Sequence, residues 1–230
     1  MSLIGNITVG LLSLLIFTSI LNVVASIFMI ADPDASIQAD NGDSISTAWL
    51  LIGLIAIPEI GLRVICALSF FIWLNRAYNN LPVIGARNLQ HSPGWAVGWW
   101  FIPFANFVKP FQVVREIYAE SAPAHRNENG DVALTPASFE IIGFWWAAFL
   151  LFGFALRISD RLADESPYFP VLYMVGHILM GVAAVLCAMI IRTINSWQMI
   201  SLVRITSGEQ FVPPPPPDFS TPNEQQYGSL

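Results

Sequence analysis

Four long apolar runs dominate the pattern of hydrophobic and polar positions along the chain. They extend from Leu3 to Ala31, from Ala48 to Leu74, from Phe139 to Leu156 and from Phe169 to Ile191. A helix needs about 20 predominantly apolar residues to cross the hydrocarbon core of a bilayer. The pattern therefore predicts an all-α integral membrane protein with four transmembrane helices.

The starts of the first and third runs carry further signals. No Lys or Arg precedes the first run, which is longer than the apolar stretch of a signal peptide, about 7–15 residues. We therefore expect an uncleaved first span. Thr135 and Pro136 are typical of an N-cap and a first helical residue ahead of the third run.

A fifth apolar stretch, Gly94 to Val108, is shorter and is interrupted by Pro103 and Asn106. A helix of about 15 residues reaches about 22 Å, which is less than the ~30 Å hydrocarbon core. Basic residues lie on both sides of this stretch, which indicates that both flanks stay on one side of the membrane. The pattern favours a re-entrant or interfacial broken helix over residues 92–118, with a fifth span as the alternative.

Several residues of this segment have a predicted interfacial role. Indole rings prefer the membrane–water interface, and Asn106 is placed to cap backbone groups freed at the break. After Pro110, Phe111, Val114 and Tyr118 share one helical face, opposite Arg115 and Glu116, which predicts an amphipathic helix on the membrane surface. The residues of the predicted motif are Trp95, Trp99, Trp100, Pro103, Asn106 and Pro110.

Composition agrees with a membrane protein of one helical domain. The 230 residues are 55% hydrophobic and 11% charged, whereas soluble domains are about 25% charged. One Lys and a net charge of −6 exclude a nucleic-acid partner. We expect a transmembrane domain over residues 1–205 and a disordered, proline-rich cytoplasmic tail over 206–230, with five consecutive prolines from Pro213 to Pro217.

The basic residues predict the orientation. The loop from Asp32 to Thr47 is acidic and has no Lys or Arg. With both termini in the cytoplasm, seven basic residues lie inside and two, Arg157 and Arg161, lie outside. The positive-inside rule therefore predicts a multi-pass protein of the cell (inner) membrane with both termini cytoplasmic.

Glu59 and Arg63 are ionisable residues inside the second run, four positions apart in the order that favours an ion pair on a helix. His177 lies in the fourth run, and its depth differs from that of Glu59 by only about 4–5 Å at 1.5 Å per residue. Charges at this depth face protein or a cavity. The spacing allows an intramembrane polar cluster of these three residues, and we take this cluster as a hypothesis. Its charged pair either joins helices or handles protons or ions.

Motifs for other chemistry are absent from the sequence. It contains no H-E-x-x-H, G-x-S-x-G, Walker A, G-x-G-x-x-G or C-x-x-C pattern, so we expect no enzymatic activity, cofactor or metal. Cys66 and Cys187 lie within apolar runs and are expected to be buried thiols. His91 and His125 lie in polar loops without neighbours at metal-ligand spacing.

One sequence pattern resembles a known family. Trp73–Leu81 (WLNRAYNNL), Ser92–Asn106 (SPGWAVGWWFIPFAN) and Lys109–Gln112 (KPFQ) are similar to the bacterial DUF4328 membrane proteins, as are Trp145-Trp146 and the stretch from Ile191 to Gln198. The resemblance covers about residues 10 to 205. It implies a multi-spanning bacterial membrane protein and no particular activity.

Two classes of function follow from these observations. The first is a non-enzymatic membrane module that interacts with or regulates a protein partner, or a second copy of itself, in the lipid bilayer. It rests on the Trp-rich segment, the amphipathic helix and the tail. The second is a small transporter or channel-like protein that uses Glu59 and Arg63. We expect the first.

Overall fold

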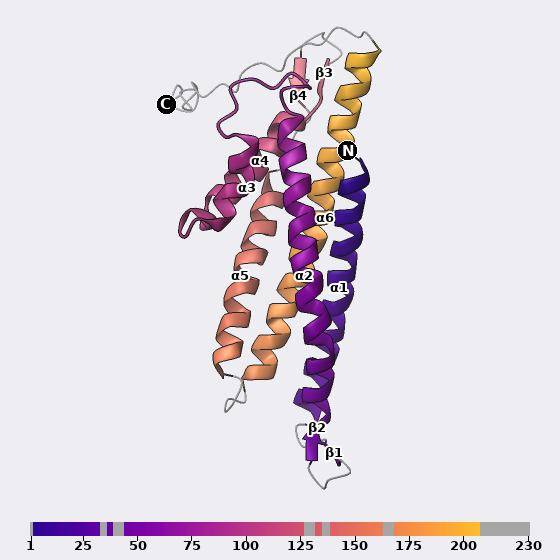
Figure 1. Cartoon of the computed structure of the whole chain (residues 1–230), viewed down its shortest axis with the longest axis vertical. Coiled ribbons are helices and arrows are strands. Elements are labelled where there is room, and N and C mark those ends of the chain that lie inside the picture. Colours follow the sequence, from indigo (N-terminus) through magenta and orange to yellow (C-terminus); the bar gives the residue numbers. More distant parts are fainter. Residues whose placement is uncertain are drawn as a thin grey trace, which may run out of the picture.

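The computed structural model describes residues 2–32, 36–38, 44–126, 132–134, 139–162 and 168–207. The predicted tail, and Thr135 and Pro136 at the predicted start of the third span, lie outside these residues. Four long helices form the body of the molecule (Figure 1): α1 (Ser2–Ala31), α2 (Thr47–Asn79), α5 (Glu140–Leu162) and α6 (Phe169–Thr206).

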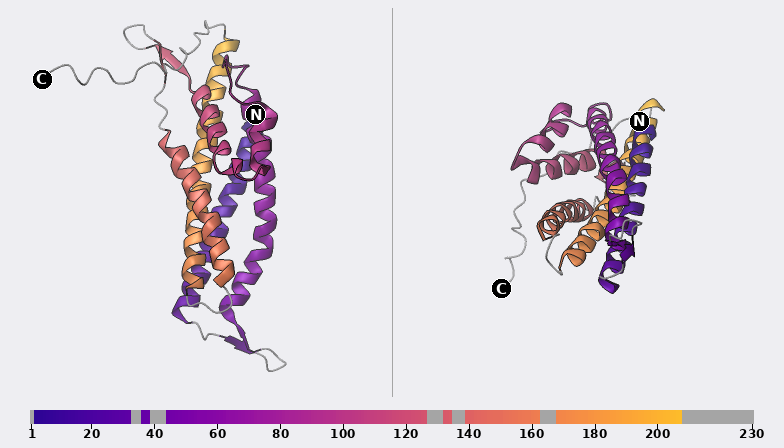
Figure 2. Two further views of the ribbon diagram at one scale, coloured as in Figure 1. Left: turned by 90° about the vertical axis from the view of Figure 1, so that its left-hand side faces the viewer. Right: turned by 60° about the horizontal axis from the view of Figure 1, so that its bottom comes forward.

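Each of the four helices is long and apolar enough to cross a membrane. They confirm the predicted all-α membrane fold. Helix α6 packs against α1 on one side and α5 on the other, and α2 packs against α1. Viewed from two further directions, the helices run along a common long axis (Figure 2).

Three of these helices continue past the predicted spans. Helix α2 ends at Asn79 instead of Leu74, α5 ends at Leu162 instead of Leu156, and α6 ends at Thr206 instead of Ile191. At 1.5 Å per residue α6 is about 57 Å long, whereas the hydrocarbon core is about 30 Å thick. The extension of α6 stays helical because Ile191, Ile194 and Gln198 are buried against other parts of the protein.

Short antiparallel strands lie in two of the connections. Strand β1 (Ser36–Gln38) pairs with β2 (Ser44–Ser46) between α1 and α2. Strand β3 (Ala124–Arg126) pairs with β4 (Val132–Leu134) ahead of α5. The sequence pattern did not predict these strands, which are three residues long. The β1–β2 side of the bundle is called the hairpin end below, and the opposite side the α4 end (Figure 1).

The central segment is a broken helix, as predicted. It consists of α3 (Pro93–Gly98), two short 3-10 turns (Trp99–Phe101 and Ala105–Phe107) and α4 (Lys109–Ser121). The hydroxyl of Ser92 caps α3 by accepting a hydrogen bond from the backbone of Trp95. At the break, Phe104 has a φ of 65°. The backbone N–H of Ala105 donates to the carbonyl of Pro103 at 2.8 Å, which defines a tight γ-turn centred on Phe104.

This segment starts at the α4 end, extends alongside α5 toward the middle of the bundle, and returns to the α4 end. The indole Nε1 of Trp146 donates to the carbonyl of Phe107 at 2.9 Å, and the ring of Phe107 stacks on that of Phe154. These two α5 residues lie about 9 and 21 Å from the start of their helix at 1.5 Å per residue. At the ends of the segment, Asn75 bonds the carbonyl of Pro93 and Gln198 bonds Ser121. The segment therefore does not cross the bundle.

Helix α4 corrects part of the amphipathic prediction. Its buried face comprises Pro110, Val113, Val114, Ile117, Tyr118 and Ser121, and it packs against α6, α5 and α2. Val114 and Tyr118 were expected on this face, but Phe111 is only half-buried. The apolar stripe of α4 is thus covered by protein instead of lipid. Periodicity shows that a stripe exists and does not show what covers it.

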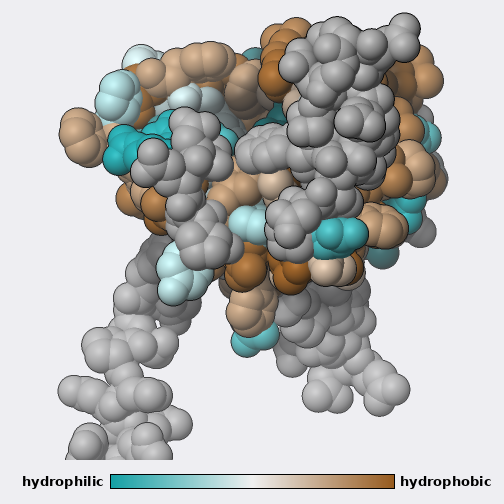
Figure 3. All heavy atoms as spheres, turned by 90° about the horizontal axis from the view of Figure 1, so that it is seen from below, coloured by the Kyte–Doolittle hydropathy of each residue, from teal (hydrophilic) through white to brown (hydrophobic). Residues whose placement is uncertain are grey.

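The flanks of the bundle expose large apolar side chains. Leu54 and Ile57 of α2 are 73% and 78% exposed, and similar residues line the outer faces of α1, α5 and α6. Seen from the hairpin end, hydrophobic residues are spread around the periphery (Figure 3). Such a surface suits a lipid bilayer and does not suit water.

Candidate intramembrane polar site

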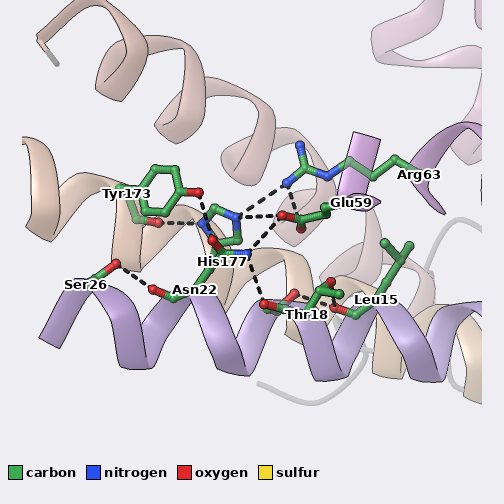
Figure 4. Close-up of polar contacts among 9 residues, drawn as sticks. Leu15, Thr18, Asn22, Ser26, Glu59, Arg63, Tyr173 and His177 are labelled. Atoms are coloured by element: carbon green, nitrogen blue, oxygen red, sulfur yellow. Dashed lines mark hydrogen bonds and ion pairs between the residues drawn. The ribbon is translucent and has the colours of Figure 1, made fainter. Parts of the chain in front are cut away.

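The structure brings Glu59, Arg63 and His177 into contact (Figure 4). Nη2 of Arg63 donates to Oε1 of Glu59 at 3.0 Å. Nε2 of His177 lies 3.4 Å from the same Nη2 and 3.7 Å from Oε2 of Glu59. Glu59 and His177 are buried, whereas 32% of the Arg63 side chain is exposed. The three side chains, which lie at similar depths along their helices, therefore do meet.

Local sequence explains the half of the site on α2. Glu59 and Arg63 are one helical turn apart, so their side chains lie on the same face. Pro58 lies inside the helix and has no N–H to donate to the carbonyl of Leu54. The carbonyl of Leu54 therefore has no i+4 donor within the helix, and the backbone hydrogen bonding of α2 is interrupted about one turn before Glu59.

Helix α1 contributes Asn22, which the sequence analysis did not single out. Its Nδ2 donates to Oε2 of Glu59 at 2.9 Å and to the carbonyl of Thr18 at 3.0 Å. Its Oδ1 accepts a hydrogen bond from the hydroxyl of Tyr173 on α6 at 2.9 Å. The amide of Asn22 is fully buried and joins α2 to α6. An uncharged residue in an uncharged run gives no signal in a search for ionisable groups.

One ring nitrogen of His177 has a fixed role. Nδ1 lies 3.0 Å from the carbonyl of Tyr173, which can only accept, so Nδ1 carries a proton. Nε2 lies between Nη2 of Arg63, at 3.4 Å, and Oε2 of Glu59, at 3.7 Å. A neutral ring accepts from Arg63 through this atom, and a protonated ring donates from it to Glu59.

Arg63 is incompletely satisfied. Both of its hydrogen bonds are made by Nη2, and the buried Nε has no partner among the described residues. Its guanidinium lies over the ring of Phe152 on α5, 5.4 Å from the centroid, a distance suited to a cation–π contact. A third of the side chain is exposed at the flank of the bundle, whereas the unpartnered Nε is buried.

The predicted residues of the broken segment take mixed positions. Trp95 is 51% exposed and its ring lies 4.7 Å from that of Trp99, while Trp100 packs among aromatic rings of α2 and α5. Pro110 is buried at the start of α4. Oδ1 of Asn106 makes no hydrogen bond to the described residues. The expected capping by this oxygen is therefore not seen, and the γ-turn that follows Pro103 closes the break instead.

A second polar cluster lies at the α4 end. Nδ1 of His91 lies 2.8 Å from Oε2 of Glu116, and the hydroxyl of Tyr78 is 3.0 Å from the same oxygen. The backbone N–H of Gln90 also bonds Glu116. Glu116 was expected on the solvated face of α4, so this cluster corrects that placement. His91 and Glu116 are 25 positions apart in the chain, so no local spacing rule could have predicted this pair.

The buried side-chain amide of Gln198 connects three parts of the chain at the α4 end. Nε2 of Gln198 donates to the carbonyl of Ala77 at 3.0 Å and to the hydroxyl of Ser121 at 2.9 Å, while its Oε1 accepts from Asn80. The side chain is 1% exposed. Gln198 thus links α6, α2 and α4 with its hydrogen-bonding capacity well used, which indicates a structural role.

The remaining candidates do not gather into a chemical centre. Cys66 and Cys187 are free and buried, in the places expected of small apolar residues. Within the ranges that the structure describes, no group of three or more His, Cys, Asp or Glu side chains is placed to hold a metal ion. The side chain of His125 is not among those that the structure describes.

Comparison with known proteins gives a family and no activity. No curated protein and no solved structure matches the chain. A family model described as a domain of unknown function, DUF4328, matches residues 38–196. That range contains α2 with Glu59 and Arg63, the broken segment, α5 and His177. The chain belongs to the DUF4328 family.

Proposed function

We propose that this protein is a non-enzymatic membrane module that binds a protein partner through the broken segment, and that the four helices hold this segment in place. The observation that carries the proposal is Phe104. Its side chain is 85% exposed, and its backbone adopts a positive φ that is strained for a bulky residue. A strained residue whose side chain packs on little of its own protein points to a contact outside the chain.

The surroundings of Phe104 support this interpretation. Phe101, Phe107 and Val108 are 71%, 47% and 52% exposed. Together with Phe104 they are called the aromatic tip here. The segment behind the tip is held firmly, because Ala96 is fully buried and Trp146 bonds the carbonyl of Phe107. A preordered apolar surface loses little entropy on binding.

Photo-crosslinking tests the proposal directly. A photoreactive phenylalanine analogue at position 104, in the cell membrane, is expected to give a discrete protein adduct. The same analogue at Ile57, which is 78% exposed on α2, is the matched control and should react mainly with lipid. The Phe104→Ala variant should lose co-purification of the partner while its thermal stability is retained. Adducts with lipid alone at both positions would contradict the proposal.

The partner is either a different protein or a second copy of this chain. Two differently tagged copies expressed together separate these cases, because only self-association produces an adduct that carries both tags. The lipid bilayer is the setting in either case, as the exposed apolar flanks require.

Transport is the second candidate, and one observation favours it. Arg63 keeps unused donor capacity beside a buried carboxylate and an imidazole. Solute flux in proteoliposomes, compared between the wild type and Glu59→Gln, tests this candidate. A reproducible flux that the variant abolishes would replace the interaction module as the proposed function.

A further inference from the structure

We propose that Glu59, Arg63 and His177 form a site that binds one proton and one small anion together. The proton goes to Nε2 of His177. The anion, of the class of chloride, nitrate or a short carboxylate, binds the unused part of the Arg63 guanidinium. This inference goes beyond the interaction module and does not depend on it.

The first step is the charge balance. When His177 is neutral, the charges of Glu59 and Arg63 compensate each other. A proton on Nε2 would give the three side chains a net positive charge in a buried site. An uncompensated charge at membrane depth is costly, so protonation without a counter-ion is unfavourable. A counter-ion is therefore part of the protonated state.

The second step is the exchange of partners. When Nε2 of His177 carries a proton it can no longer accept from Arg63, and it becomes a donor to Oε2 of Glu59, which is already 3.7 Å away. Asn22 holds that carboxylate in place from the opposite side. Protonation therefore strengthens the attraction of His177 for Glu59 and leaves Arg63 with one partner fewer.

The third step is the place of the anion. Arg63 is the charged member of the site with substantial exposure, 32%, and both of its hydrogen bonds to the described residues are made by Nη2, which leaves Nη1 as a donor. Phe152 covers one face of the guanidinium, so the in-plane N–H groups remain the donors for a ligand. Guanidinium N–H groups bind oxyanions and carboxylates in this plane.

The other groups around the site do not supply a counter-charge. Helix α1 contributes the neutral amide of Asn22, and α6 contributes the hydroxyl of Tyr173. From α5, Phe152 faces Arg63, and Asp160 acts on Tyr173 only electrostatically from an exposed position. Binding of the proton and binding of the anion must then favour each other by the same factor.

Thermal unfolding of the purified protein in detergent tests the coupling. Sodium chloride, nitrate or acetate should raise the Tm relative to sodium gluconate at about pH 5 and not at about pH 8, the range in which histidine changes charge. Equal stabilisation at both pH values, or none at either, would overturn the proposal.

Variants assign the two roles. Arg63→Gln should lose the anion effect, and His177→Asn, whose amide can still donate to the carbonyl of Tyr173, should lose its pH dependence. Arg115→Gln and His91→Asn remove a cation and an imidazole at the α4 end, and both should behave as the wild type. If the site variants do not fold, proton uptake by the wild type decides. When nitrate is added to weakly buffered protein, the protein should take up protons in proportion to the nitrate that it binds. Absence of proton uptake would overturn the proposal.

Discussion

The side-chain amide of Asn22 donates to the carboxylate of Glu59 across 2.9 Å, from a helix 37 residues earlier in the chain. The same amide accepts a hydrogen bond from Tyr173. Three helices, α1, α2 and α6, are thereby tied at one buried point. This relationship makes Asn22 the residue on which the geometry of the polar site depends.

Replacing Asn22 by Ala should destabilise the protein clearly. The change removes a hydrogen bond to a charged group and leaves a buried carboxylate oxygen without its partner, at a cost of about 2 kcal/mol in the free energy of unfolding. Ser13→Ala is the control, since among the described residues the hydroxyl of Ser13 bonds only the carbonyl of Val9 in its own helix. Unfolding of the detergent-solubilised protein measures both. Equal losses for the two variants would show that Asn22 does not hold Glu59.

Glu59 and Arg63 are expected to be energetically coupled. Glu59→Gln or Arg63→Gln alone leaves a charge without its partner, at a cost of about 3 kcal/mol, the low end for a buried pair because a third of Arg63 is exposed. The double variant should recover part of this loss. A double-mutant cycle on thermally or chemically unfolded protein measures the coupling. Strictly additive losses would mean that the two side chains act independently.

The sequence was sufficient for the helices and for the charged part of the site. Apolar runs located α1 almost to the residue, and depth along each helix placed His177 near Glu59. Helix lengths were underestimated, because a run of high hydropathy marks only the part of a helix that lies in the bilayer. Helix α6 continues beyond its apolar run, where Ile194 and Gln198 are buried against other parts of the protein. Hydropathy therefore cannot locate the end of a helix that continues as protein-packed structure.

Pairing between helices was beyond sequence reasoning. Asn22 has no charge, and the contact of His91 with Glu116 joins a loop to a helix 25 residues away. The face of a helix that meets another is set by rotation about its axis, which a single sequence does not fix. For the same reason the apolar stripe of α4 was assigned to lipid, although Val113 and Ile117 are buried in protein.

Glu120 on α4 should make stability depend on pH. Burial raises the pKa of its carboxyl, and the nearby Glu116 raises it further. A raised pKa in the folded state means that its contribution is complete below the unfolded pKa, about 4.3, and is lost as the pH rises through the folded value. Glu120→Gln should therefore flatten the stability profile above that pH. Unfolding curves of both proteins over a pH series measure this, and parallel profiles would contradict it.

The orientation of the broken segment can be tested with single cysteines. Gln90 and Gln112 are both exposed and lie on either side of the break. In a background without Cys66 and Cys187, a membrane-impermeant thiol reagent should label neither position in intact cells and both after the membrane is opened. This result would place both flanks in the cytoplasm. Labelling at position 112 alone in intact cells would instead mean a fifth span.

The γ-turn at Phe104 predicts an unusual order of stability between two small substitutions. Elsewhere in a folded chain Ala is more favourable than Gly, by about 0.5–1 kcal/mol, because Gly loses more backbone freedom on folding. A positive φ reverses this order, because a side chain at such a position costs about 1–2 kcal/mol. Phe104→Gly should therefore be more stable than Phe104→Ala.

Phe101 provides the matched comparison. It is 71% exposed in the same segment, and it is not among the residues with positive φ, so Phe101→Ala should be more stable than Phe101→Gly. Thermal unfolding of the four variants in detergent gives the two orders directly. Because neither order depends on a partner, the result tests the strain at Phe104 by itself. If Ala were the more stable choice at both positions, Phe104 would not be strained, and the argument that an external contact maintains it would lose its basis.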